Sequence, residues 1–338
     1  MKLSERKHKL LVNAIEEHIK DASPITSGSV AEKQNLNLST ATLRSELSAL
    51  EEMGYLKQMH TSGGRLPTAM GYKYYVNSLL NNLKASPKQL KIIHEQLLER
   101  ADSLLDIVSK IAKTVAEQTS YPTVVLLDGA GKLVIEQIQI VSLVANQALI
   151  LIKTQSGCVY NTISTNATES SCKDVSNFLT QQFKSKTLEF LLENINQFTE
   201  AYQKMFYDFK NMINNIIDII RKLLKFPPMQ IKGHGAQKML SQSAMEQTQK
   251  IFGLLENEST LAKAVKSDND NLTLLMEDDG EMQGCAIIKA PIRMGGQQIA
   301  SIGVVGPERM DYASIASTLK LVTDELSGQT KNKKKEKK

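Results

Sequence analysis

The chain has 338 residues, enough for two or three domains with hydrophobic cores, and its 41% hydrophobic and 23% charged content is ordinary for a globular protein. The net charge of +5 comes from residues 331–338, which hold six lysines and one glutamate, so any nucleic-acid contact must depend on where charges are placed and not on overall basicity. Three well-separated cysteines argue against a disulfide framework or a zinc cluster, and we expect a cytoplasmic protein without a signal peptide or a membrane-spanning segment.

The first predicted elements are two helices. Ser4 opens an amphipathic helix that ends at the breaker sequence Asp21-Ala22-Ser23-Pro24. A short second helix is expected to begin near Thr26 or Ser27 and to run to residue 33.

The third predicted helix covers residues 39–53. Ser39 is a favoured N-cap, and Gly54 follows the last apolar position, where a left-handed residue commonly ends a helix. Apolar residues recur at helical spacing, at Leu43, Leu47, Leu50 and Met53. With that face directed inward, polar side chains occupy the other faces of the first turns: Thr40, Thr42, Arg44 and Ser45.

A hairpin and a further helix follow. Residues 55–60 predict a short strand, residues 61–64 a turn and residues 65–67 a returning strand, and Thr68 can cap the next helix. This order of elements, with Arg65 expected at the hairpin tip, is typical of a winged helix-turn-helix, whose third helix enters the major groove of DNA.

The candidate DNA contacts follow from this arrangement. Arg44 can contact a guanine edge or a phosphate; the alternative is a surface arginine paired with Glu46 or Glu51. Short hydroxyls are better suited to phosphates than to bases. Arg65, after two glycines, can enter a minor groove or bind phosphate, or can belong to an ordinary turn. The full set is Ser39, Thr40, Thr42, Arg44, Ser45, His60, Gly64, Arg65 and Lys73.

The remainder of the chain predicts two β-rich blocks, residues 121–165 and 270–306, on either side of a helical block. Since neither block has enough strands for a stable sheet, we expect one α+β domain with an insertion. The Gly129-Ala130-Gly131 segment is interpreted as a hairpin turn. Apolar residues in the helical block follow a heptad spacing that suits a dimer helix or a core helix, and the candidate dimer contacts are Tyr202, Met205, Phe209, Met212 and Ile216.

Five segments together resemble one known family. They are residues 38–44 (LSTATLR), 50–56 (LEEMGYL), 60–68 (HTSGGRLPT), 71–76 (GYKYYV) and 303–312 (GVVGPERMDY). With these segments the chain is similar to the HrcA family of bacterial heat-inducible transcription repressors. Where that family usually has Asn, this chain has Ser45, which cannot bond an adenine in the bidentate way that Asn does.

The resemblance implies a fold and a mode of action. The expected fold is α+β: an N-terminal winged helix-turn-helix, then a GAF-like α+β domain that carries an inserted, mainly helical dimerisation domain. The corresponding boundaries are 1–84 for the DNA-binding domain, 88–168 and 236–328 for the two GAF-like parts, 169–235 for the insert and 329–338 for a Lys-rich disordered tail.

The resemblance also implies that a homodimer binds double-stranded DNA at an inverted repeat, the CIRCE element, and that the chaperonin GroEL assists the repressor into its active form. No enzymatic activity, metal or cofactor is expected. Two alternatives remain open: a winged-helix regulator gated by a small ligand in the GAF-like domain, and a chaperonin-associated scaffold whose winged helix contacts protein and not DNA.

Overall fold

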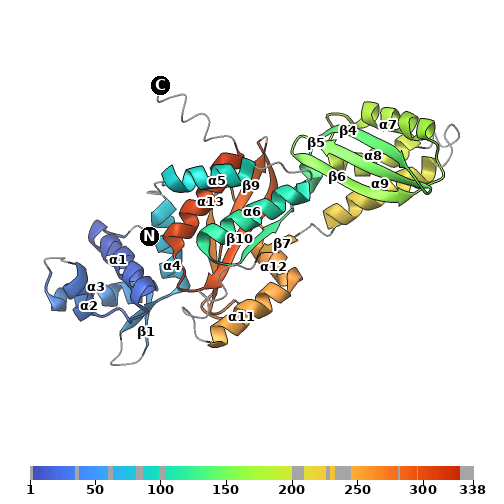
Figure 1. The fold of residues 1–338 in the computed structure, drawn as a ribbon. Coiled ribbons are helices and arrows are strands. Elements are labelled where there is room, and N and C mark those ends of the chain that lie inside the picture. Colours follow the sequence, from blue (N-terminus) through green and yellow to red (C-terminus); the bar gives the residue numbers. More distant parts are fainter. Residues whose placement is uncertain are drawn as a thin grey trace, which may run out of the picture.

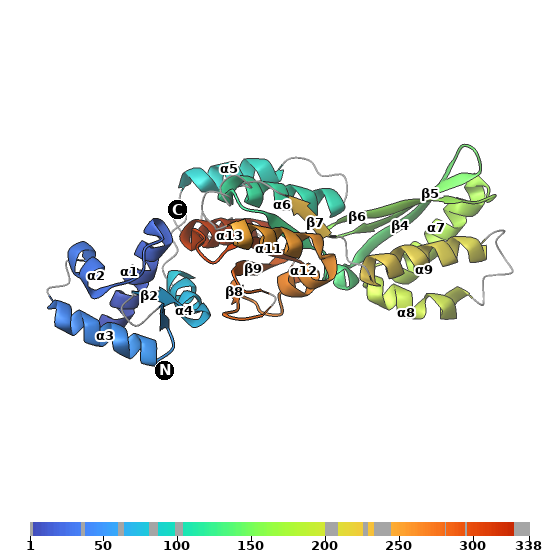
Figure 2. The same ribbon diagram turned by 90° about the horizontal axis from the view of Figure 1, so that it is seen from below.

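The chain folds into three parts that follow one another along an elongated molecule (Figures 1 and 2). An N-terminal unit (residues 3–80) lies at one end, a sheet unit (residues 87–126 and 229–327) lies in the middle, and an insert (residues 133–225) lies at the other end. The computed structural model describes residues 3–34, 38–59, 64–80, 87–98, 104–199, 209–225, 229–232, 245–280, 282–294 and 296–327.

The N-terminal unit contains three helices, a hairpin and a fourth helix. The Ser4 hydroxyl accepts a hydrogen bond from the N–H of Lys7 at 3.4 Å, which confirms the predicted start of the first helix. Side chains from all of the longer helices meet in one core, including Leu11, Leu47 and Val76. The elements are α1 (Glu5–Asp21), α2 (Ser27–Gln34), α3 (Thr40–Glu52), β1 (Leu56–Gln58), β2 (Arg65–Pro67) and α4 (Ala69–Leu80).

The sheet unit is built around a five-stranded antiparallel sheet in the order β7-β3-β10-β9-β8. Strand β10 is buried at every position from Ile299 to Pro307, because helices cover both faces of the sheet. Helices α6 and α13 contact one face; α12 contacts the other, where Gly303 lies against Val265. The elements are α5 (Pro87–Leu98), α6 (Leu104–Thr119), β3 (Thr123–Leu126), β7 (Met229–Lys232), α11 (Met245–Glu256), α12 (Glu258–Val265), β8 (Thr273–Met276), β9 (Cys285–Met294), β10 (Gln297–Pro307) and α13 (Tyr312–Leu326).

The insert combines a three-stranded antiparallel sheet, in the order β4-β5-β6, with helices on one of its faces (Figures 1 and 2). Helix α7 lies along the outer edge of β4, where the hydroxyls of Ser176 and Thr180 bond the backbone of Ile140 and Ile138. These hydroxyls satisfy backbone groups that a neighbouring strand would otherwise occupy, and they close this edge to other chains. The elements are β4 (Ile135–Leu143), β5 (Gln147–Thr154), β6 (Gly157–Ser164), α7 (Glu169–Phe183), α8 (Leu188–Thr199) and α9 (Phe209–Lys225).

Two expectations about this region are wrong. The segment around Gly129 is no hairpin turn, because β3 pairs with β7 and β10 and a single 3₁₀ turn, η1 (Ala130–Lys132), leads from one sheet to the other. A Cβ at Gly129 would lie 2.1 Å from the carbonyl oxygen of Gln298, so this close passage requires glycine. Strands β4 to β6 were expected in the GAF-like part ending at residue 168, but within the described residues they form a sheet of their own and so belong to the insert.

Across the described residues, no helix is both long and apolar enough to cross a lipid bilayer. The same part of the chain brings no three His, Cys, Asp or Glu side chains together in a way that could hold a metal ion.

Candidate nucleic-acid interface

Helix α3 is defined at both ends by its own sequence. The Ser39 hydroxyl oxygen accepts a hydrogen bond from the N–H of Thr42 at 3.1 Å, and Gly54 follows the helix with a φ of +80°. Leu43, Leu47 and Leu50 are fully buried, so the apolar face points into the unit as predicted. The predicted cap, stop and inward face of this helix are confirmed.

The outer face of α3 carries the polar side chains that the sequence singled out. Ser39, Thr40, Arg44 and Ser45 are exposed, and Thr42 is half-buried. Among the described residues, Arg44 takes part in no ion pair or hydrogen bond within the chain. The alternative that paired Arg44 with Glu46 or Glu51 is wrong, because both carboxylates are bound to other cations.

Glu46 is a buried charge on the inner side of α3. Its side chain is 7% exposed and forms ion pairs with Arg6 and Lys7 of α1, the Lys7 Nζ lying 2.8 Å from Oε2. The hydrogen bond from Lys7, with the Arg6 guanidinium, holds the pKa of this carboxyl below its ordinary value of 4.5. Glu46 therefore fixes α3 against α1. This role was not predicted, although a glutamate within the 43–47–50 apolar stripe indicates a buried, paired charge.

We expect Glu46→Gln to lower the stability of the N-terminal unit at pH 7 by about 1–2 kcal/mol, because a charged hydrogen bond is replaced by a neutral one. Since the folded-state pKa is lowered, the stabilisation is complete above pH 4.5 and is lost as the pH falls through the folded-state pKa. Hydrogen exchange of α3 amides, corrected for its intrinsic pH dependence, measures the difference. Glu52→Gln, an exposed position on the same helix, is the control. If the stability difference between wild type and Glu46→Gln stayed constant down to pH 3, the role given to the Glu46 charge would be wrong.

The hairpin is attached to the rest of the unit at its base. Leu56, Lys57 and Gln58 pair with Pro67, Leu66 and Arg65, and Arg65 also exchanges two backbone hydrogen bonds of 2.8 Å with Ile25. The hairpin is therefore extended by a third, single-residue strand from the segment between α1 and α2.

The expected position of Arg65 at the hairpin tip is wrong, because Arg65 pairs with Gln58 inside the hairpin strands. Its Nε donates to the Glu51 carboxylate at 2.7 Å and its guanidinium donates to the Ser48 hydroxyl at 2.9 Å, leaving the side chain 13% exposed. Arg65 thus ties the hairpin to the end of α3. Gly64 packs closely on the segment before α2: a Cβ there would lie 2.6 Å from the Pro24 side chain, so this packing requires glycine.

The two remaining candidates near the hairpin differ. His60 lies outside the described residues. Lys73 is exposed on α4. The neighbouring Tyr72 and Tyr75 are buried, with their rings 5.7 and 6.5 Å from the ring of Tyr312 in the sheet unit, so both are packing residues.

The candidate dimer contacts on α9 are also corrected. Phe209, Met212 and Ile216 are at most 1% exposed because α9 packs them inside its own insert, so they have no surface to offer a partner. Tyr202 and Met205 lie outside the described residues. Of the two interpretations that the heptad spacing allowed, the described part of α9 is a core helix.

The insert has an apolar surface elsewhere, on the face of the β4-β5-β6 sheet that none of the described helices covers (Figure 1). Val141 lies beside Leu149, and Leu151 lies beside Tyr160. Val141, Leu143 and Tyr160 are 46%, 42% and 57% exposed, whereas Ile138 and Ile150 on the opposite face are buried. We call Val141, Leu143, Leu149, Leu151 and Tyr160 the open sheet face.

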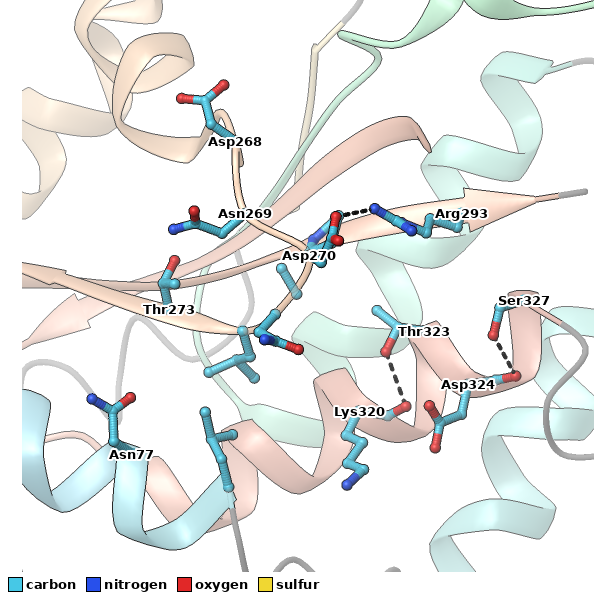
Figure 3. Close-up of a pocket in the computed structure, with 15 residues that line it drawn as sticks. Asn77, Asp268, Asn269, Asp270, Thr273, Arg293, Lys320, Thr323, Asp324 and Ser327 are labelled. Atoms are coloured by element: carbon cyan, nitrogen blue, oxygen red, sulfur yellow. Dashed lines mark hydrogen bonds and ion pairs between the residues drawn. The ribbon is translucent and has the colours of Figure 1, made fainter. Parts of the chain in front are cut away.

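A polar groove of about 990 Å³ lies where the N-terminal unit meets the sheet unit (Figure 3). Asn77 of α4 lines one side, Thr273 of β8 and Arg293 of β9 line another, and Lys320 and Asp324 of α13 form the floor. The Arg293 guanidinium is already paired with Asp270, and the lining is mainly polar.

Comparisons with known proteins agree with the motifs noted in the sequence. The family profile described as the HrcA protein C-terminal domain matches residues 105–316. A heat-inducible transcription repressor HrcA of Thermoanaerobacter pseudethanolicus is 30% identical, with 97% of each chain covered. One from Moorella thermoacetica is 27% identical over 97% of this chain and 98% of its own.

A solved structure described only as a hypothetical protein superimposes with a TM-score of 0.60, at 18% identity, over 97% of this chain and 98% of that chain. This likeness supports the mixed α and β fold. With a family profile that spans most of the chain and relatives that match it from end to end, the chain belongs to the HrcA family of heat-inducible transcription repressors.

Proposed function

We propose that this protein represses transcription of heat-shock operons by binding promoter DNA as a homodimer, with the outer face of α3 in the major groove. The observation that carries the proposal is the contrast between the two sides of α3. Its inner carboxylates are bound to Arg6, Lys7 and Arg65, whereas Arg44 is exposed and unpaired among the described residues. An arginine held ready in this way suits a guanine edge or a phosphate.

The topology of the N-terminal unit supports the assignment as a winged helix-turn-helix. Helices α1, α2 and α3 precede the β1–β2 hairpin, and Ile25 adds a bridge beside Arg65. In this interpretation α3 is the recognition helix, its exposed hydroxyls at Ser39, Thr40 and Ser45 bind phosphates, and the hairpin follows the adjacent backbone.

The five-stranded antiparallel sheet, with helices on both faces, supports a GAF-like domain interrupted by the insert. Strands from both sides of the insert, β3 before it and β7 after it, are direct neighbours in this sheet. The insert can therefore fold as a separate body without disturbing the sheet that carries it.

We propose the open sheet face as the dimer contact in place of the α9 residues. A two-fold protein that reads an inverted repeat needs a self-complementary surface. Apolar side chains from three adjacent strands offer such a surface at the end of the molecule opposite α3. Assistance by the chaperonin GroEL is proposed on the resemblance to the family.

A footprint on the organism's own chaperone-operon promoters tests the function. We expect protection of an inverted repeat on one face of the duplex, at half-sites separated by whole helical turns. Absence of sequence-specific protection, with or without purified chaperonin, would favour the scaffold alternative.

The groove in Figure 3 favours one other arrangement, a repressor gated by a small polar ligand at the joint between α4 and the sheet unit. Gel shifts with and without a metabolite extract separate the two, because only ligand gating makes binding depend on the extract. Dependence on added chaperonin instead supports control through folding.

A further inference from the structure

The N-terminal unit is joined to the sheet unit through α4, which packs on β8 and α13. Part of this joint is apolar. The rings of Tyr72 and Tyr75 lie against Tyr312, whose hydroxyl donates to the Glu308 carbonyl oxygen at 2.5 Å within the sheet unit. Apolar contacts of this kind are not directional, so these rings alone leave α4 free to rotate slightly on the sheet unit.

A directional contact lies at the N-terminus of α4. Asp278, in the loop between β8 and β9, accepts a hydrogen bond from the N–H of Ala69, the first residue of α4, at 3.0 Å. The same carboxylate oxygen lies 3.8 Å from the Nζ of Lys57 in β1. This loop of the sheet unit therefore contacts both the last helix of the N-terminal unit, α4, and its hairpin.

Asp278 is not needed to start α4. The Thr68 hydroxyl already caps this helix, accepting from the N–H of Gly71 at 3.1 Å and donating to the Gly54 carbonyl oxygen at 2.6 Å. The Asp278 contact is therefore additional to the local cap, and it links two units instead of completing one helix. A carboxylate at a helix N-terminus is also favoured by the exposed N–H groups there.

A helix that is held at two separated points cannot change its angle as freely as a helix that is held at one point. Ala69 and Tyr75 are six residues apart along α4, a separation of roughly 9 Å at 1.5 Å per residue. With Tyr75 held against Tyr312 at one point and Ala69 held by Asp278 at the other, the angle of α4 on the sheet unit is fixed. Since α4 and the hairpin are continuous with α3, this angle also sets the direction of α3 relative to the sheet unit.

We propose that Asp278 is a specificity-determining residue for the spacing between the two operator half-sites. This inference rests on the proposed function, because only a dimer bound to an inverted repeat is sensitive to the spacing between two half-sites. In such a dimer the separation and angle of the two recognition helices depend on how rigidly each N-terminal unit is held. Asp278 lies on the side of α4 that faces the sheet unit and contacts no residue of α3 in the described structure; its one link to the hairpin there is the 3.8 Å pair with Lys57.

The test compares Asp278→Ala with wild type on three duplexes: the footprinted inverted repeat, the same repeat with one base pair inserted between the half-sites, and a single half-site. Wild type is expected to bind the lengthened repeat more weakly than the native one. In Asp278→Ala this penalty should shrink by about two- to fivefold, the loss expected for removal of a carboxylate at a helix N-terminus. The penalty is the ratio of the two affinities for the repeats, so any change that the freed Lys57 makes to half-site affinity cancels and is measured separately on the single half-site.

Two further variants and one structural measurement sharpen the test. Asp279→Ala removes the same charge from the neighbouring exposed position and should keep the wild-type penalty. Asp278→Asn keeps an acceptor for the Ala69 N–H but not the attraction to Lys57, and should lie between wild type and Asp278→Ala. Hydrogen exchange at the start of α4 should be faster in Asp278→Ala than in Asp279→Ala.

The outcomes separate this proposal from the proposed function. An unchanged spacing penalty in Asp278→Ala, or an equal change in Asp279→Ala, overturns the role of Asp278 while leaving the repressor intact. Wild type that binds neither the repeat nor the half-site overturns the proposed function, and this inference with it.

Discussion

Arg44→Ala is expected to lower the affinity for the operator by about 5- to 150-fold, the equivalent of about 1–3 kcal/mol for a good arginine–guanine contact. The side chain is exposed and unpaired among the described residues, so its removal leaves the core of the N-terminal unit intact. Gel shifts against the native repeat and against repeats with one base pair changed measure both the loss and the position at which specificity is relaxed.

The salt dependence distinguishes a base contact from a phosphate contact at Arg44. A phosphate contact predicts a uniform loss across sequences and a salt slope smaller by about one unit. The control is Lys263→Ala, which makes an equal charge change at an exposed position of α12 in the sheet unit and should bind as wild type does. Wild-type affinity in Arg44→Ala would show that α3 does not use this arginine.

The double variant Val141→Lys and Leu143→Lys is expected to convert the dimer into a monomer and to weaken binding to the inverted repeat by about 10²–10⁴-fold. The loss is large because two linked half-site contacts become independent ones. Both side chains lie on the open sheet face and are more than 40% exposed, so lysines there are compatible with the folded insert. In a two-fold contact they would place like charges opposite one another.

Sedimentation and circular dichroism check this result together. A folded monomer that still binds a single half-site is the expected outcome. The control is Phe190→Lys with Phe252→Lys, two exposed aromatic residues on α8 and α11 away from the open sheet face, which should leave the dimer unchanged. A folded dimer in the Val141 and Leu143 variant would exclude this face as the contact. Phe209→Glu would not discriminate, because Phe209 is a core residue and its loss unfolds the insert.

Much of the N-terminal unit could be predicted from the sequence because its boundaries are set locally. The Ser39 hydroxyl finds its partner three residues away, Gly54 takes the positive φ that ends the helix, and Thr68 caps α4. Periodicity also shows correctly which face of α3 is apolar. For the candidate site, the exposure of Arg44 and its neighbouring hydroxyls follows from that face.

Where a prediction was wrong, the deciding partner lies outside the few neighbouring residues that a sequence pattern covers. Arg65 looks like a tip residue until Glu51 and Ser48 are brought beside it, and Gly64 looks like a residue freed for DNA until Pro24 packs on it. Likewise, an apolar stripe on α9 shows that something covers it, but spacing cannot tell a neighbouring helix from a second molecule.

The sequence by itself determined the capped helix with Arg44 on its polar face and the alternation of helical and β segments, since these depend on residues within a few positions of each other. It also determined the family, because each of the five segments that carry the resemblance is a short local motif. Only the tertiary structure decided that β3 joins the strands that follow the insert, that β4 to β6 form a separate sheet with one open face, and that Asp278 meets the start of α4. Strand partners, covered faces and contacts between units are chosen by competition among segments far apart in the chain, such as Ala69 and Asp278, which are 209 residues apart, and local propensity carries no information about that competition.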